Sequence, residues 1–539
     1  MPTLHWIGKD KVINHHHEVP FRVLVPGERY MASESAPANT TDNLIVHGDN
    51  LEALKSLLPQ YEGKVHCVYI DPPYNTGSEG WVYNDNVSDP KLQKWLGEVV
   101  GKEGEDLSRH DKWLCMIYPR LKLLYRLLAP EGVIFVSIDD NEVQHLRPVL
   151  DELFGAANRI EQFIWKKSYG GGAKERYAVT VHEYILMYAK DKAKIQSLSL
   201  PPDPSAEARY YKLTDDKELT RGPFRVKPLE ATKSMDRREN LVYPIRTPDG
   251  TEIMPKRQWW WSRERVEAAQ VNGDLYFSKD RTGNWSVQYK QYLRDDSGDE
   301  RRSKPFSILD GPYNQVGSAL LREIFADRGH EVFPFPKPVE LIEKLLAMLP
   351  LPKDALILDS FAGSGTTAHA VLKTNVKEGT NYRFILIETL DYAENLTAER
   401  VRRVSQGYGE TPALGGGFNF YSVGGPVFTE AGELNDEVGL EALRGYMTYT
   451  EGIPAEHRTS QDNPYSPHLL GLSPDVAWLF NYEPAVATCL NFEYLSTLNF
   501  GDKRPATAII YADRCFLSKD FMQAHRLVFK KIPRDVTRF

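Results

Sequence analysis

The sequence predicts an α/β fold in which a parallel sheet is covered by helices on both faces. Residues 42–195 and 331–412 alternate short apolar runs with longer segments of helical periodicity. This alternation is typical of parallel sheets, because each connection between parallel strands returns over the sheet as a helix. Between the two stretches the composition changes, so the chain of 539 residues is expected to form several domains.

The first stretch begins with two buried strands and a helix between them. The strands are Val65–Ile70 and Gly132–Asp139, both short apolar runs. The helix is indicated by one apolar face, which comprises Leu114, Ile117, Leu121, Leu124 and Leu128. Pro119 falls inside this pattern and is expected to start or kink a segment there.

Strands and helix ends continue the pattern on both sides of the compositional break. Asp140 is expected to cap the next helix and Gly155 to end it. His182–Tyr188 is a third strand, and Leu356–Leu358 and Phe384–Ile387 are strands of the second stretch. The sheet is therefore predicted to be assembled from two separated parts of the chain.

Changes in composition and in hydrophobic periodicity predict the domain boundaries. Residues 197–310 are rich in Pro, Gly, Arg, Lys, Trp and Tyr with weak periodicity, which indicates an inserted domain. Gly415–Gly417 marks a further boundary, and Ala506–Ala512 followed by Phe521–Val528 reads as a strand and a helix of a C-terminal α/β module. We expect five parts: residues 1–41, 42–195, 196–330, 331–412 and 413–539.

Composition excludes several classes of protein. No apolar run is long enough to span a bilayer, and the first residues lack the apolar core of a signal peptide, so a cytoplasmic protein is expected. Four widely spaced cysteines without zinc spacing predict reduced structural thiols, namely Cys67, Cys115, Cys489 and Cys515. The net charge of −8 means that any surface for a polyanion must be local.

A run of three histidines is the one simple metal-binding pattern in the sequence. His15–His17 is interpreted as a solvated run in a mobile N-terminus, because no second cluster of ligands accompanies it. No metal site is predicted.

The first chemical motif is Asp71-Pro72-Pro73-Tyr74, directly after a predicted strand. Functional groups of parallel sheets gather at the carboxyl ends of strands, which places Asp71 at such an edge. The prolines fix the backbone and leave the Pro72 carbonyl free to accept, while Tyr74 supplies a flat face. Two acceptors beside a stacking surface suit an aromatic amine. Taken alone, the motif is more often a stiff turn capped by Asp71.

The second motif is a glycine turn between a strand and a helix. It starts at Asp359 and continues through Phe361, Gly363, Ser364, Gly365, Thr366 and Thr367. Glycines let a ligand approach the backbone, and the helix start offers free N–H groups. The absence of a following Lys argues against a P-loop, and the missing third glycine argues against a dinucleotide fingerprint. Glu388 ends the next strand, where an acid accepts from ribose hydroxyls, so a nucleoside-bearing cofactor is indicated.

The two motifs in this order resemble the β-order amino-methyltransferases of DNA, in which the catalytic motif precedes the target-recognition region and the cofactor motif comes last. Further segments are similar to the modification subunits of type III restriction–modification systems, namely His47–Leu54, DPPYNTG from Asp71, Trp81–Asp85, Phe135–Asp140 and Phe335–Ile342. The resemblance covers about residues 44–408. It implies a Rossmann-like, S-adenosylmethionine-dependent methyltransferase sheet with permuted motif order.

The resemblance also implies roles for individual residues. Asp71, Pro72, Pro73 and Tyr74 would hold and stack an adenine flipped out of duplex DNA. The cofactor pocket would comprise Asp49, Asp71, Lys337, Pro338, Asp359, Phe361, Gly363, Ser364, Gly365, Thr366, Thr367 and Glu388, with Glu388 on the ribose. Methyl transfer would then be an in-line displacement that needs alignment of the amine and no metal.

DNA recognition is expected in the inserted domain, around three consecutive tryptophans. Cations and aromatic faces alternate there, and the predicted DNA-binding residues are Lys256, Arg257, Trp260, Arg263 and Arg265. Three consecutive Trp side chains cannot share one face, so at least one is expected in a core.

Several functions stay open at this point. The favoured function is an adenine-N6 methyltransferase of a restriction–modification or phage-defence system, acting on duplex DNA at the nucleoid. A cytosine-N4 enzyme would carry Ser in place of Asp71. The sequence is also compatible with a non-catalytic specificity subunit and with an RNA or protein methyltransferase. By analogy we expect a homodimer. The sequence shows neither a helicase P-loop nor a nuclease carboxylate cluster, so no restriction activity is expected in this chain, and a restriction subunit with helicase activity is left open as a partner.

Overall fold

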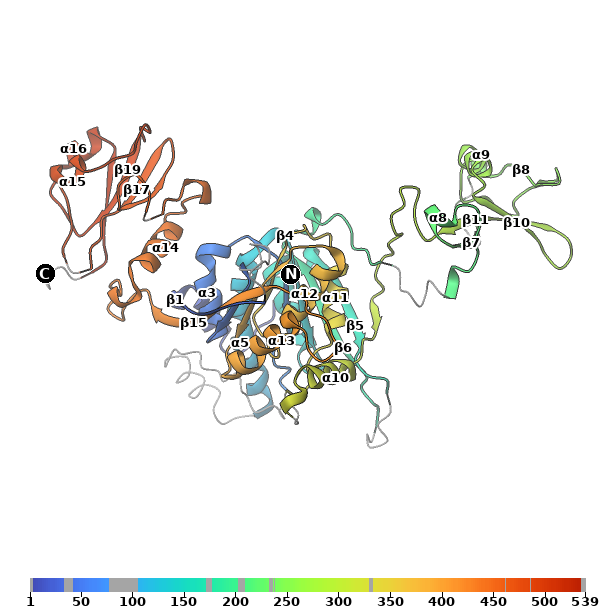
Figure 1. Cartoon of the computed structure of the whole chain (residues 1–539), viewed down its shortest axis with the longest axis horizontal. Coiled ribbons are helices and arrows are strands. Elements are labelled where there is room, and N and C mark those ends of the chain that lie inside the picture. The colour runs from blue at the N-terminus through green and yellow to red at the C-terminus, as the bar shows by residue number, and fades with distance from the viewer. Residues whose placement is uncertain are drawn as a thin grey trace. The chain divides into compact units, whose positions relative to one another are not determined.

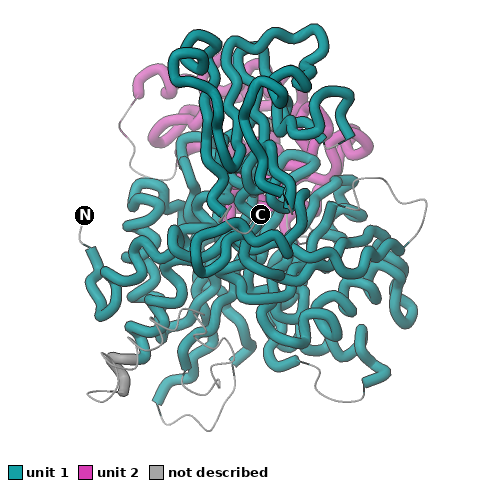
Figure 2. The backbone as a smooth tube through the Cα atoms, turned by 90° about the vertical axis from the view of Figure 1, so that its left-hand side faces the viewer, with its two compact units in different colours: residues 1–196, 306–346, 350–539 teal, residues 197–305, 347–349 magenta. Residues whose placement is uncertain are grey.

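The computed structural model describes residues 3–32, 42–76, 105–170, 177–201, 209–231, 236, 238–328, 333–460, 462–484 and 486–534. It forms two compact units (Figure 2), of which the second comprises residues 197–305 and 347–349. The first unit contains the rest of the chain, including residues 306–346. Trp81–Asp85 and Gly77, which contributed to the family resemblance, lie outside the described residues.

A ten-stranded sheet forms the centre of the first unit (Figure 1), with strand order β1-β15-β2-β14-β13-β3-β4-β6-β5-β12 among the described residues. The strands are β1 Arg22–Met31, β2 Leu44–His47, β3 Val65–Ile70, β4 Leu128–Ile138, β5 Arg159–Lys166, β6 His182–Ala189, β12 Ile308–Asp310, β13 Leu356–Asp359, β14 Arg383–Glu388 and β15 Gly417–Pro426. Strands β14 and β13 of the second predicted stretch lie between β2 and β3 of the first, so the two stretches share one sheet.

The sheet is mixed, which corrects the prediction of a parallel one. Strands β15, β2, β14, β13, β3 and β4 run parallel to one another. Strand β6 runs antiparallel to both β4 and β5, and β1 runs antiparallel to β15. The buried apolar run of β6 reads the same in either direction, because a strand covered on both faces shows no alternation.

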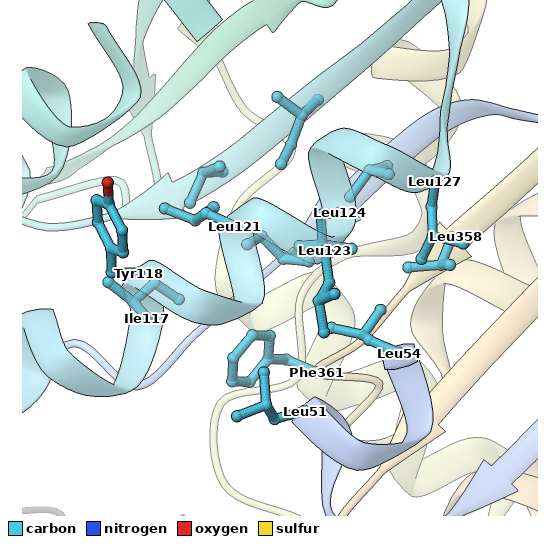
Figure 3. Packing of buried hydrophobic residues seen from close by; sticks show 14 of the residues in the cluster. Leu51, Leu54, Ile117, Tyr118, Leu121, Leu123, Leu124, Leu127, Leu358 and Phe361 are labelled. Atoms are coloured by element: carbon cyan, nitrogen blue, oxygen red, sulfur yellow. The ribbon is translucent and has the colours of Figure 1, made fainter. Parts of the chain in front are cut away.

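Helices α3 (Asn50–Tyr61) and α5 (Glu105–Leu127) pack against each other on one face of the sheet. Their leucines meet Leu358 of β13 and Phe361 in one apolar cluster (Figure 3). Helix α5 continues through Pro119 without a break, so no helix starts at Pro119. Burial of the helix on both sides of the proline outweighs the single backbone hydrogen bond that proline removes.

The turn after β4 also differs from the prediction. Helix α6 (Val143–Leu150) has Glu142 at its N-cap position, and the Asp140 carboxylate instead accepts a hydrogen bond from the Tyr184 hydroxyl at 2.8 Å. Asp140 therefore does not cap the helix. The helical segment does end at Gly155, which adopts a positive φ of 88° after a π-helical turn.

The N-terminal residues belong to the first unit. Helices α1 (Lys9–Val12) and α2 (His15–Glu18) contact α5, and the Lys55 ammonium donates to the His16 carbonyl at 2.7 Å. His15 and His16 are buried, which corrects the interpretation of a solvated histidine run. Burial, together with nearby positive charges, lowers the pKa of His16 to about 4.

The remaining helices of the first unit's central part are α10 Asn314–Ile324, α11 Val339–Ala347, α12 Thr366–Glu378 and α13 Glu399–Gln406. Among the described residues, none of the helices is both long and apolar enough to cross a membrane. All four cysteines are free thiols, as predicted.

The C-terminal part of the first unit carries a sheet of its own, in the order β16-β17-β19-β21. Its elements are α14 Leu440–Thr450, β16 Leu469–Leu472, β17 Val476–Phe480, α15 Phe492–Ser496, β19 Thr507–Ala512, α16 Lys519–Ala524 and β21 Leu527–Lys531. The expected strand is β19. The expected helix at Phe521–Val528 ends at Ala524, and its last residues belong to β21.

The second unit contains a three-stranded sheet of order β10-β11-β7 and helix α9. Its elements are α8 Glu218–Arg221, β7 Phe224–Pro228, β8 Ile245–Arg246, β9 Glu252–Ile253, α9 Arg263–Val271, β10 Leu275–Lys279 and β11 Trp285–Tyr292. Trp259 lies in its apolar cluster and donates its indole N–H to the Tyr243 carbonyl at 2.7 Å. One of the three consecutive tryptophans is therefore in a core, as predicted.

Candidate active site

Two loops that are far apart in sequence become neighbours because β3 and β13 pair in parallel. The loop after β3 carries Asp71–Tyr74, and the loop after β13 carries Phe361–Gly365. Parallel strands end at the same edge of a sheet, so both loops lie at the carboxyl edge where ligands of α/β proteins bind. The topology thus brings the two predicted motifs into one site.

Asp71 is the charged centre of this edge. Its carboxylate oxygens accept from the Lys337 ammonium at 2.8 and 2.7 Å, and the Tyr74 hydroxyl donates to Oδ1 at 2.8 Å. The same ammonium lies 4.9 Å from the centre of the Tyr74 ring. Lys337, expected in the cofactor pocket, therefore contacts Asp71 and Tyr74 of the DPPY loop directly.

Glu183 of β6 is a second carboxylate at the site, and the sequence analysis missed it. It accepts from the Tyr74 hydroxyl at 3.2 Å and from the Lys167 ammonium at 2.7 Å. Burial alone would raise the pKa of Glu183, but Lys337, Lys167 and these hydrogen bonds bring it below its usual value. The only sequence signal was an acid at the start of an otherwise apolar strand.

Tyr74 is held as a neutral hydrogen-bond donor. Burial, followed by the negative charges of Asp71 and Glu183, raises the pKa of its phenol well above the usual value. The carbonyl of Pro73 is occupied by the Trp113 indole N–H at 2.7 Å. Among the described residues, the carbonyl of the buried Pro72 accepts no hydrogen bond, which leaves it available as an acceptor.

The glycine turn after β13 is closed by two buried acids. Asp359 accepts from the Phe361 N–H at 3.0 Å and from the Thr367 hydroxyl at 2.5 Å. Glu388, at the end of β14, accepts from the Gly363 N–H at 2.7 Å. These predicted cofactor ligands thus shape the turn, and Glu388 is fully buried beneath it.

Arg400 of α13 donates hydrogen bonds to the same turn, and the sequence analysis did not identify it. Its guanidinium is fully buried and donates to the Ser364 hydroxyl at 3.0 Å and the Thr366 hydroxyl at 2.9 Å. Among the described residues no carboxylate pairs with it, and burial lowers its pKa to about 10. The buried Arg400 guanidinium thus fixes the side chains at the start of α12.

The remaining predicted cofactor residues lie around this turn. Asp49 caps α3, accepting from the Leu51 and Glu52 N–H groups at 2.9 and 3.1 Å, and its neighbour Asn50 donates to the Ser360 carbonyl at 3.1 Å. Pro338 is buried next to Lys337, whose carbonyl accepts from Thr366 at 3.3 Å.

The residues present fit a nucleoside cofactor. Gly363 and Gly365 have positive φ values of 53° and 78°, and a Cβ added to Gly365 would lie 3.0 Å from the Thr397 carbonyl oxygen. Side chains are thus excluded where a ligand would approach the backbone. The buried hydroxyls of Ser360 and Thr389, directly after β13 and β14, lack hydrogen-bond partners among the described residues. They remain available to a polar ligand.

Asp359 makes the stability of the protein depend on pH. Burial raises its pKa from 3.8 to about 7, so the folded state keeps a proton that the unfolded chain releases. The free energy of unfolding contributed by this group therefore falls as pH rises from about 4 to about 7. Asp359→Asn cannot ionise, so its stability relative to the wild type should increase as pH rises from about 4 to about 7. Denaturant unfolding at several pH values measures this difference, with the exposed Asp475→Asn as control. A difference that does not change with pH contradicts the prediction.

The predicted DNA-binding residues lie in the second unit. Lys256, Arg257, Arg263 and Arg265 are exposed, and Trp260 is 47% exposed. The Arg263 and Arg265 guanidinium groups lie 5.1 Å and 4.3 Å from the ring centres of Tyr243 and Trp261. The second unit therefore exposes two arginine side chains that make cation–π contacts, and it also exposes Trp260.

Comparisons with known proteins show which family this chain is similar to. Residues 65–399 match a family model described as DNA methylase, N6_N4_Mtase. The Mod subunit of the type III restriction-modification enzyme StyLTI from Salmonella typhimurium is 31% identical, over 87% of this chain and 73% of that protein. The EcoPI Mod subunit of Escherichia phage P1 is 31% identical, over 72% of this chain and 63% of that protein. The EcoP15I Mod subunit of Escherichia coli is 28% identical, over 75% of this chain and 69% of that protein.

The family match includes the DPPY loop, the second unit, Lys337 and the glycine turn up to Glu399. It covers more than half of the chain, and the StyLTI similarity extends over most of the remainder. The chain therefore belongs to the DNA methylase family, whose members are methyltransferases that use S-adenosylmethionine.

Proposed function

We propose that the protein methylates the N6 amine of adenine in duplex DNA, as the modification component of a type III-like restriction–modification system. The observation that carries this proposal is the cluster of Asp71, the Pro72 carbonyl and the Tyr74 ring at one strand end. It offers two acceptors and a stacking face to a planar aromatic amine. The Asp at the start of the motif favours adenine over cytosine.

The Asp71 carboxylate can still accept a hydrogen bond from the target amine. Each carboxylate oxygen has two acceptor positions; Tyr74 and Lys337 use Oδ1, whereas only Lys337 is bonded to Oδ2 among the described residues. One acceptor position on Oδ2 therefore remains for an N–H of the target. The carboxylate also faces the positive charge that develops on the amine nitrogen during attack, which it stabilises.

The cofactor would be held by the glycine turn and the residues around it, namely Gly363, Ser364, Gly365, Thr366, Phe361, Glu388 and Lys337. When bound, S-adenosylmethionine supplies an electrophilic methyl group. Residues of this chain align the amine with it, and such alignment can remove a large share of the barrier without a covalent intermediate. The target base must leave the duplex to reach Asp71, because its amine is inaccessible within the stack.

The experiment uses S-adenosylmethionine with a labelled methyl group and unmethylated duplex DNA, followed by digestion to nucleosides and mass spectrometry. Labelled N6-methyladenine is the expected product. Labelled N4-methylcytosine would overturn the choice of base, and label in RNA or protein alone would overturn the choice of substrate.

The second unit is the proposed target-recognition domain, and Trp260 tests this assignment. An exposed ring that stacks on a base contributes about 1–3 kcal/mol, so Trp260→Ala should weaken DNA binding about fivefold or more. Fluorescence anisotropy at fixed salt measures the affinity, because phosphate contacts depend on salt. The control is Leu219→Ala, which removes a 95% exposed side chain from the same unit. Equal affinities for both variants would contradict the assignment.

As a modification component, the protein would act in the cytoplasm at the nucleoid as a homodimer, together with a separate restriction subunit that has helicase activity. Support comes from the similarity to type III Mod subunits. Analytical ultracentrifugation of the purified chain on unmethylated DNA tests the dimer, and a monomer that still modifies DNA would exclude it.

A further inference from the structure

A buried carboxylate beside the DPPY loop has no role in the site described above. Glu142, at the N-cap of α6, is fully buried and accepts hydrogen bonds from three side chains. They are the Asn75 amide, the His110 Nδ1 at 2.6 Å and the His145 Nδ1 at 2.9 Å. The acid therefore connects the loop after β3 with α5 and with the turn after β4.

Asn75 gives this connection a direct consequence for Tyr74, its neighbour in sequence. Asn75 is 4% exposed and has a φ of 57°, in the left-handed region that non-glycine residues seldom adopt. On the other side of Tyr74, the Pro73 carbonyl accepts from Trp113, three residues after His110 on α5. Pro73 and Asn75, the two neighbours of Tyr74, are thus both held by helix α5, the first directly and the second through Glu142.

We infer that Glu142 is a positioning residue for methyl transfer, which through Asn75 fixes the backbone that orients Tyr74 and Asp71. This inference rests on the proposed function. His110 and His145 hold the carboxylate in place, since each donates to a different oxygen. A shift of about 1 Å in a reacting group can lower the rate about 100-fold, so a loose loop should lower kcat strongly.

Glu142 and its two histidine partners, His110 and His145, are also close enough to chelate a metal ion. The nitrogen–oxygen distances of 2.6 and 2.9 Å are those of hydrogen bonds between the imidazoles and the carboxylate. Together with the hydrogen bond from Asn75, these contacts favour a hydrogen-bond network centred on Glu142. Metal binding by this cluster is one of the outcomes that the test distinguishes.

The test compares Glu142→Met and Asn75→Ala with the wild type. Each should lower kcat about 30- to 100-fold and leave the Kd of S-adenosylmethionine within about twofold. The double variant should be no slower than the slower single variant, because both changes remove one shared connection. Glu142→Gln should retain most activity, since its amide oxygen can still accept from Asn75 and His110. A fluorescent adenine analogue at the target position reports the stacking of Tyr74 independently of turnover.

Glu152→Met is the matched control. Glu152 follows the same helix α6 and is bonded to the Lys9 ammonium at 2.6 Å and the Tyr118 hydroxyl at 3.0 Å. Its loss should lower the melting temperature without a change in kcat. A variant of Glu142 that slows the reaction only as much as this control would overturn the inference.

The remaining outcomes are equally decisive. An active wild type beside equally active Asn75→Ala and Glu142→Met overturns the inference alone, whereas a wild type that transfers no label to DNA overturns the proposed function and the inference with it. If EDTA abolishes wild-type activity and Zn²⁺ restores it, and Glu142→Met neither binds Zn²⁺ nor responds to it, the cluster is a metal site and the positioning role is wrong. Should Glu142→Met fail to fold, Asn75→Ala and Glu142→Gln still decide the question.

Discussion

Replacement of Asp71 by Asn should lower kcat for methyl transfer by about 10²- to 10³-fold, the effect of removing one group that stabilises developing charge. The variant keeps the shape of the side chain but loses the negative charge that faces the target amine. Its amide would also leave the Lys337 ammonium without the carboxylate that now accepts from it at 2.8 and 2.7 Å. Binding of S-adenosylmethionine should change only a few-fold, because the glycine turn does not depend on Asp71.

Single-turnover methylation and a separate measurement of cofactor affinity test this expectation. Asp140→Asn is the control, since Asp140 follows the neighbouring strand β4 but bonds to Tyr184 outside the proposed site. Unchanged turnover in Asp71→Asn would exclude Asp71 as the residue that holds the amine. A loss of cofactor binding that accounts for the whole effect would assign Asp71 to the cofactor instead.

Replacement of Arg400 by Met should weaken S-adenosylmethionine binding about 10- to 100-fold while changing thermal stability little. The guanidinium makes hydrogen bonds that stabilise the fold by roughly 1.5–3 kcal/mol each. Burial of its charge opposes this gain, as the pKa of about 10 indicates. These contributions are of similar size, so the fold gains little from Arg400, whereas the Ser364 and Thr366 hydroxyls lose the group that orders them.

Isothermal titration with the cofactor and thermal melting, measured on the same samples, separate the two effects. Arg403→Met on the same helix is the control, because Arg403 pairs with Asp327 and Glu399 away from the turn. A large fall in melting temperature with unchanged cofactor affinity would show that Arg400 serves the fold and not the site.

The sequence was informative where a physical signal is local. Strands β3, β13 and β14 were predicted because each is a short apolar run followed by a polar turn. Asp71 and the glycine turn were found because their chemistry is contiguous in sequence. The antiparallel direction of β6 was not predicted, because strand direction depends on partners that a single apolar run does not specify.

Residues that act across the fold were missed for a related reason. Glu183 is a single acid in an otherwise apolar strand, whereas Arg400 and Glu142 lie among other charged residues that do not distinguish them. Their partners lie 109, 36 and 67 residues away, at Tyr74, Ser364 and Asn75. Only the folded structure shows which donors and acceptors surround these charges. The burial of His15 and His16 likewise depends on packing against α5, which the histidine run itself does not reveal.

The place of β15 in the central sheet has a consequence for how the protein folds during synthesis. Strand β2, made early, lies between β14 and β15, and among the strands that the structure describes β1 pairs only with β15. The ribosome must therefore deliver Gly417–Pro426 before that side of the sheet can close. Until then β1 and β2 present unpaired backbone edges, which are prone to pair with other chains. Such long-range pairing is also slow, because a long loop must close first. The nascent enzyme thus passes through a long interval in which protection by a chaperone is of most value.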